Sequence, residues 1–246
     1  MVNVYFYPGW GIAENPKEWD IVKNAESRFE GHKPTLTPMF PEYSVTDEKY
    51  ILRLIKFCEI FKIDSITICW YWDDGNELWN KFLDKFIEFV RDTKLKFSLM
   101  WVQRKPYKKF PLKITGDDDI YEPETDSRKI KIKYSDYKNL AEDMLKYLNH
   151  PNYLQVNNKY CITIFEVKNM VRDLGETTKQ FISEIRKKIT YHTNRQITLI
   201  GISHHVNDLL PLKKLGFDYT TSYVFLPDWQ KAGIFDYEQT MNQRLK

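Results

Sequence analysis

Two carboxyl groups stand where apolar runs of the sequence end. Asp73 directly follows the run Ser65–Trp72, and Glu166 comes near the end of the run Lys159–Val167. A carboxyl group in such a place can give or accept a proton during catalysis. The competing interpretation for Glu166 is a structural ion pair, with Lys168 as one candidate partner, and for Asp73 it is the cap of a following helix. We predict that both are catalytic, because strand ends in α/β barrels favour functional sites.

Aromatic side chains are the most distinctive part of the composition, with 15 Phe, 16 Tyr and 7 Trp. Flat rings bind the apolar faces of sugars and bases alike. Trp10, Trp72 and Trp101 each end one of the first three apolar runs. As a group they predict a stacking surface for a ligand, although each one alone could equally belong to the core. Tyr223, in the last run, is predicted to hydrogen-bond a ligand or an ionised carboxylate.

Histidines and cysteines form no metal-binding pattern. His204 and His205 follow a further run, and adjacent side chains point in different directions, so one of them at most faces a pocket; we predict His204. A metal site would need a third ligand at suitable spacing, and the sequence offers none. The spacing of Cys58, Cys69 and Cys161 matches no zinc or redox motif, which is typical of buried thiols in a reducing compartment. We therefore expect no metal site.

Short β-branched or aromatic runs alternate with amphipathic helical patterns, which predicts a parallel α/β architecture. Pro8-Gly9-Trp10-Gly11 follows the first run without the spacing or the helix of a dinucleotide-binding turn, which favours a barrel over a doubly wound sheet. About six strand–helix units are recognisable where a full barrel has eight, so residues 1–246 are predicted to form one (β/α)-barrel domain that is incomplete at its C-terminal end. The predicted strands are Val2–Tyr7, Ser65–Trp72, Lys96–Trp101, Lys159–Val167, Ile197–Ser203 and Tyr219–Val224.

Six helical patterns follow these strands, and the last of them starts near Asp236. The first starts at Thr46-Asp47, the second runs from Glu77 to Asp92, and the third opens at Ser135. The fourth contains Phe181 to Ile189, and a short fifth contains Leu209, Leu212 and Leu215 before Gly216. Long segments, 11–45 and 104–134, leave the carboxyl ends of the first and third strands, where barrel enzymes build their sites.

Charge and hydropathy exclude several functional classes. The formal net charge is only +3, whereas nucleic-acid binding usually shows as a concentrated basic face. No apolar run approaches the roughly 18 residues that a membrane span needs. No signal peptide precedes the first predicted strand, so we expect a cytoplasmic protein with neither a membrane span nor a nucleic-acid partner.

Six motifs follow one another along the chain. They are Phe6-Tyr7-Pro8-Gly9-Trp10 with Glu18-Trp19, Arg28-Phe29-Glu30-Gly31-His32, Ile63 to Gly75, Leu99-Met100-Trp101, His150-Pro151-Asn152-Tyr153 with Ile164-Phe165-Glu166, and Leu215 to Val224. In order and spacing these motifs resemble the glycoside hydrolase family 99-like proteins, a group that also includes WbsX-type proteins named as polysaccharide glycosyltransferases. The resemblance covers about nine-tenths of the chain.

The resemblance implies a (β/α)8 TIM-barrel-like fold and retaining hydrolysis of an α-mannoside or related glycan, an oligosaccharide or polysaccharide, without a cofactor. It also brings Glu18, Trp19 and His32, from the long first loop, into the predicted substrate-binding set. On sequence alone, these three residues would be interpreted as parts of a surface loop.

The sequence departs from the family in two places. Trp101 is followed by Val102-Gln103-Arg104-Lys105, which is basic where the family has other residues, and the family's N-E-W-x-E-type stretch with its catalytic pair is not found. We therefore expect the carboxylates to be Glu166 with Asp73, or to come from a C-terminal segment or a partner chain. An incomplete barrel leaves strand edges that need cover, so self-association is also expected.

Two alternatives to a hydrolase stay open. The chain could be a catalytically inactive barrel that binds glycan through its aromatic residues. It could also be a glycosyltransferase of polysaccharide biosynthesis, which the names of its relatives suggest although the sequence has no nucleotide-sugar motif.

Overall fold

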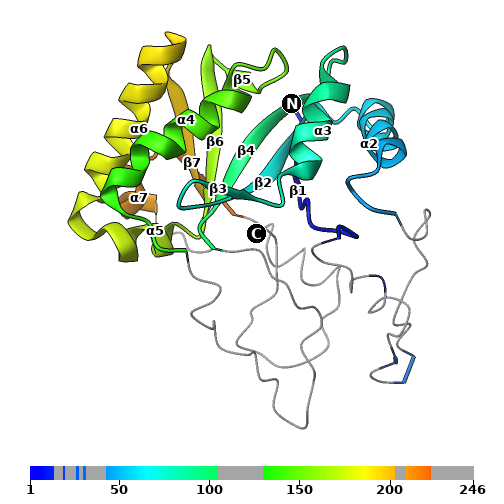
Figure 1. The fold of residues 1–246 in the computed structure, drawn as a ribbon, viewed down its shortest axis with the longest axis horizontal. Coiled ribbons are helices and arrows are strands. Elements are labelled where there is room, and N and C mark those ends of the chain that lie inside the picture. The colour runs from blue at the N-terminus through cyan, green and yellow to red at the C-terminus, as the bar shows by residue number, and fades with distance from the viewer. Residues whose placement is uncertain are drawn as a thin grey trace, which may run out of the picture.

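A curled parallel sheet with helices packed on its outer face forms the centre of the structure, a computed structural model of the chain (Figure 1). It describes residues 1–13, 19, 26–27, 30–31, 43–104, 130–202 and 209–222. Within these residues six strands lie side by side in the order β1-β2-β4-β6-β7-β8, each parallel to its neighbours. They are β1 Asn3–Phe6, β2 Ser65–Asp73, β4 Lys96–Val102, β6 Lys159–Phe165, β7 Ile197–Ile202 and β8 Tyr219–Thr221.

The curl of the sheet brings its first and last strands to within side-chain reach. The hydroxyl groups of Tyr5 on β1 and Thr221 on β8 are hydrogen-bond partners, although these strands stand at opposite ends of the strand order. A flat sheet of six strands would hold them about 24 Å apart, at about 4.8 Å per strand. The described strands therefore form a partial barrel, which confirms the predicted fold class.

Six described helices follow the strands along the chain, and one of them was not predicted. Their bounds are α2 Glu48–Ile60, α3 Lys81–Val90, α4 Tyr137–Leu148, α5 Val167–Leu174, α6 Thr178–Thr193 and α7 Leu209–Leu215, with 3-10 turns at Tyr134–Asp136 and Gly175–Thr177. The unpredicted helix is α5, because its first residue, Val167, continues the apolar run of β6. No described helix combines the length and the hydrophobicity that crossing a bilayer requires.

A hairpin shortens the predicted second helix. The segment β3, Asn76–Leu78, turns back antiparallel onto β2 and pairs Asp73 with Asn76, so α3 begins only at Lys81. The turn contains Asp74 and Gly75, both with positive φ. A second short antiparallel segment, β5 (Gln155–Val156), pairs with β6.

The two faces of the sheet differ in side-chain type. Ser65, Thr67, Ser98 and Thr163 are small and polar, are at most 4% exposed, and share the lumen side of the strands. Thr67 and Ser98 are hydrogen-bonded to each other at 2.9 Å, and Asn3 joins them from β1. The opposite face carries apolar residues that pack against α3, α4 and α6, so the main core lies between the sheet and its helices. The largest of its side chains are Trp70, Trp72, Trp101, Tyr153, Phe82, Phe86, Phe97 and Phe181.

Candidate functional site

The carboxyl edge of the curled sheet holds the candidate site. Parallel strands end at the same edge, so the residues just beyond β2, β4 and β6 lie near one another. Tyr71, Val102 and Phe165 are register neighbours on these strands. Asp73 comes two residues after Tyr71, Arg104 two residues after Val102, and Glu166 one residue after Phe165.

Glu166 has an uncommon backbone conformation, with φ 59° and ψ 48° in the left-handed region. For a residue with a Cβ this conformation costs about 1–2 kcal/mol, and such residues cluster at functional sites. Its side chain is 28% exposed, and Oε1 lies 3.1 Å from Nε of Arg104. Its other oxygen, Oε2, accepts a hydrogen bond of 3.0 Å from Asn169 Nδ2. The carboxylate is thus fixed in direction while part of its surface stays open.

Arg104 points toward the lumen of the partial barrel. Its guanidinium lies over the ring of Phe165, 5.9 Å from the centroid, and it interacts electrostatically with the thiol of Cys69 on β2. Burial raises the pKa of Cys69 to about 12, and the positive charge of Arg104 acts in the opposite direction. Arg104 therefore brings a positive charge between the strands that carry Asp73 and Glu166.

Asp73 ends β2 at the hairpin and is partly buried. Its strand and that of Glu166 both neighbour β4, so two strand spacings, about 10 Å in all, separate their backbones. The hairpin that follows Asp73 is tied to α4 through Glu77. The Glu77 carboxylate accepts hydrogen bonds from Trp70 Nε1 at 2.9 Å, Lys146 Nζ at 3.0 Å and the Tyr147 hydroxyl.

Trp72 and Trp101 lie on the other side of the sheet from the lumen. Trp72 is 2% exposed and donates from Nε1 to Asp143 of α4 at 2.7 Å, whereas Trp101 is fully buried and stacks on Phe181 of α6. Neither ring has a free face for a sugar in this structure. The candidate site is therefore built without them.

Trp10 and Trp19, by contrast, lie in direct contact although they stand nine positions apart in the sequence. Their rings meet edge to face, with centroids 5.3 Å apart, and Trp19 makes the same kind of contact with Tyr43. Trp19 Nε1 donates to the carbonyl oxygen of Tyr43 at 2.8 Å. Both tryptophans are partly exposed beyond the carboxyl end of β1, where an aromatic pair can stack on a sugar ring.

Four predicted site residues, Glu18, His32, His204 and Tyr223, lie outside the described residues. Among the residues that are described, no three His, Cys, Asp or Glu side chains gather closely enough to hold a metal ion.

Sequence reasoning missed Asn169 and the role of Arg104, which it noted only as part of a basic departure from the family. Strand alternation was the available signal. Counting by twos from Ser98 reaches Met100, Val102 and Arg104, and this places Arg104 on the side of the small polar residues.

Comparison with known proteins connects this geometry to a family. The family model described as "Glycosyltransferase WbsX" matches residues 10–245. Two structures of the GH99 endo-α-mannosidase from Bacteroides thetaiotaomicron, one with bis-tris-propane, resemble the chain with TM-scores of 0.58 and 0.56 at 12% sequence identity. A structure described as a glycoside hydrolase-like protein gives a TM-score of 0.52, also at 12% identity.

The chain spans about three-fifths of the length of the two endo-α-mannosidase chains. The matches cover 92% of this chain and 60% and 62% of theirs, and for the third structure the shares are 82% and 52%. At this identity the structures establish the barrel fold alone. No protein with a curated description matches the chain. The fold of this chain resembles the GH99 barrel. Because the family model matches nearly every residue, the chain belongs to the WbsX family.

Proposed function

We propose that this chain is a glycoside hydrolase that cleaves α-mannoside-like linkages of an oligosaccharide or polysaccharide, with residues 1–246 acting as one domain. The observation that carries the proposal is Glu166, held in a strained backbone conformation and aimed by Arg104 and Asn169 at the carboxyl edge of a barrel sheet. The likeness to an endo-α-mannosidase, which is that protein's own activity, supports the choice of linkage.

In this proposal Glu166 and Asp73 form the carboxyl pair. Retaining glycosidases place their two carboxyl groups about 5–5.5 Å apart, and inverting ones about 6.5–9.5 Å apart with a water between. The backbone separation of about 10 Å suits the wider spacing, whereas the family resemblance implies retention. The anomer formed first therefore tests the pair: inversion supports Asp73 with Glu166, and retention points to a second carboxylate elsewhere.

Trp10 and Trp19 extend the proposed site beyond the first strand. Their edge-to-face contact leaves part of each ring exposed, and a sugar unit stacked there would hold the glycan across the carboxyl edge. Glu18, His32, His204 and Tyr223 stay predictions as further substrate-binding residues.

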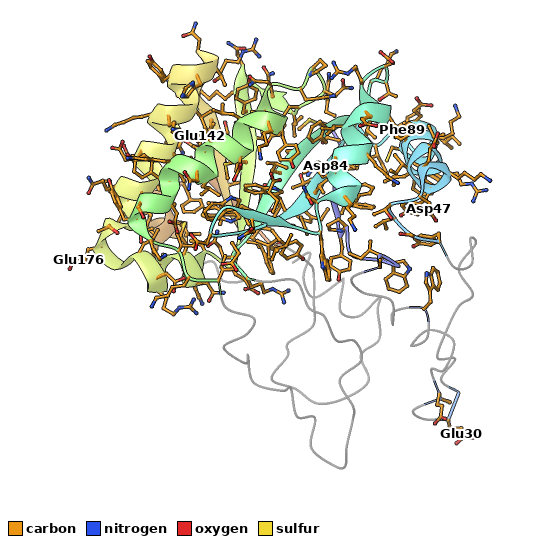
Figure 2. All side chains as sticks on the ribbon, in the orientation of Figure 1. Glu30, Asp47, Asp84, Phe89, Glu142 and Glu176 are labelled. Carbon is orange, nitrogen blue, oxygen red and sulfur yellow. The ribbon has the colours of Figure 1, made fainter. Side chains whose placement is uncertain are left out.

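The test is hydrolysis of reducing-end-labelled α-mannan oligosaccharides by the full chain, followed by chromatography and by NMR of the anomeric proton. We expect Glu166→Gln to lower kcat about 100-fold or more, the range of general acid–base effects. The matched control is Glu142→Gln. Glu142, labelled in Figure 2, is a 60%-exposed residue of α4 paired with Lys188 of α6, far from the carboxyl edge.

A second candidate function, glycosyl transfer, is favoured by the description of the family. Sugar transfer from a nucleotide- or lipid-linked donor, without hydrolysis of α-mannans, would establish it in place of the first. Glycan binding without either reaction would instead support the inactive-barrel alternative.

A further inference from the structure

One side-chain amide contacts the residues that directly follow β4 and β6, two of the three strands that end at the candidate site. Nδ2 of Asn169, on α5, donates to the carbonyl oxygen of Gln103 at 3.1 Å and to Glu166 Oε2 at 3.0 Å. Gln103 is the residue directly before Arg104. A single NH2 group therefore holds the main chain next to the guanidinium and the carboxylate that pairs with it.

The same residue also holds the turn that contains Glu166. The backbone N–H of Asn169 donates to the carbonyl oxygen of Glu166 at 2.9 Å, which closes the turn between β6 and α5. This bond stabilises the left-handed conformation that aims the Glu166 side chain back toward Arg104.

Arg172 fixes the orientation of the Asn169 amide. Oδ1 of Asn169 accepts a hydrogen bond of 3.2 Å from Nη1 of Arg172, and Nε of Arg172 lies 2.8 Å from Asp173. Because a guanidinium can only donate, Oδ1 must face Arg172, and Nδ2 must face Glu166 and Gln103. A flipped amide would set two donors against each other, so the arrangement has one stable orientation.

We infer that Asn169 is the positioning residue of the Arg104–Glu166 pair, and that it fixes both the strand end before Arg104 and the carboxylate of Glu166. The expected effect of Asn169 on kcat rests on the proposed function. The expected dependence of the Arg104–Glu166 ion pair on the Asn169 amide can be tested without any enzymatic activity.

The decisive experiment compares Asn169→Leu with a matched control, Asn80→Leu. Nδ2 of Asn80 donates to Asp84 at 3.0 Å, also to a carboxylate a few residues away, but at the start of α3 rather than beside Arg104. The readout is the NMR signal of the Arg104 Nε–H, assigned with Arg104→Lys. We expect this signal to move toward that of exposed arginines and to exchange faster in Asn169→Leu, and to stay in place in Asn80→Leu.

Kinetics on the glycan that the wild-type chain cleaves give the second readout. We expect kcat to fall about tenfold or more in Asn169→Leu while KM changes less than about threefold, because misalignment of a reacting group lowers kcat. Asn169→Asp keeps the size and polarity of the side chain and serves if the leucine variant fails to fold. It is expected to lower kcat and to move the acidic limb of the pH–rate profile upward, since adjacent carboxylates resist joint ionisation.

An Arg104 signal unchanged in both Asn169 variants would overturn the inference. A wild-type chain that cleaves no glycan would count against the proposed function alone, and the NMR comparison would then decide the inference by itself. Equal kinetic losses in the Asn169 and Asn80 variants would assign Asn169 a general structural role and reject the positioning role.

Discussion

Replacing Asn152 with alanine is expected to destabilise the fold strongly without affecting the candidate site. The Asn152 side chain is 2% exposed, and its Nδ2 donates to three carbonyl oxygens, of Val90 and Thr93 at 2.9 Å and of Leu95 at 3.0 Å. These carbonyls belong to the connection between α3 and β4. The amide therefore takes the place of regular secondary structure in binding these carbonyls at the amino end of the sheet.

The expected magnitude follows from the hydrogen-bond count. The two amide hydrogens are worth about 1 kcal/mol each, and a carbonyl left buried without a donor adds about 1 kcal/mol or more. The sum is about 3 kcal/mol. For chains of 150–250 residues each kcal/mol lowers Tm by about 2–4 °C, so Asn152→Ala should lose about 6–12 °C.

The assay is thermal unfolding followed by circular dichroism, with Asn149→Ala as the control. Asn149 ends α4 with an exposed side chain, so its replacement should change stability by less than about 0.5 kcal/mol. Turnover, measured well below the transition, should match the wild type in both variants. A Tm for Asn152→Ala within about 2 °C of that for Asn149→Ala would refute the assigned role of this amide.

Three further outcomes can be checked on the same protein. Burial lowers the pKa of His150, and the nearby cations Arg91 and Lys96 lower it further. The unfolded state therefore binds a proton at His150 near pH 6.5, where the folded state still holds a neutral imidazole. The free energy of unfolding in urea should fall between pH 7.5 and 5.5, and it should fall less in His150→Gln. Glu77→Gln should cost about 1–3 kcal/mol in urea unfolding, because the single oxygen of the amide cannot accept both from Trp70 and Tyr147, which share Oε2, and from Lys146, which donates to Oε1. A cost near zero would contradict the role assigned to Glu77 in tying the hairpin to α4. Ellman's reagent should modify no cysteine in the folded chain and three in urea, because burial raises the pKa of every thiol, namely Cys58, Cys69 and Cys161; rapid modification of the folded chain would contradict this.

The six strands of the sheet and most helices could be predicted because continuous apolar runs of strand length alternate with segments of 3.6-residue periodicity. Two local features could not. The hairpin at Asn76–Leu78 is stabilised by Glu77, whose partners Lys146 and Tyr147 are some 70 residues away in sequence. Helix α5 begins with Val167, which no local pattern separates from the preceding apolar strand.

The candidate site was predicted unevenly for a related reason. A strand that is buried on both faces has no polar side, so its sequence does not indicate which residues face the lumen and which face the helices. Every residue at the end of such a strand is then an equal candidate for the site. Trp72 and Trp101 were chosen by position, yet both face the helices. Small polar residues were the missing guide: steps of two from Thr67 reach Asp73 on the lumen side, and never reach Trp72.

The amino edge of the sheet carries residues that stabilise the fold, whereas the carboxyl edge carries the residues of the proposed chemistry. At the amino edge the Asn152 amide satisfies buried carbonyls with ordinary backbone geometry around it. At the carboxyl edge Glu166 keeps an unfavourable conformation and a part-exposed charge that a chain selected for stability alone has no need of. A residue of the first kind should change Tm and leave turnover intact, whereas Glu166→Gln, which keeps the shape of the side chain, should change turnover far more than Tm. Equal effects of both substitutions on both measurements would mean that Glu166 is a structural residue, and the inactive glycan-binding barrel would then be the better account of this chain.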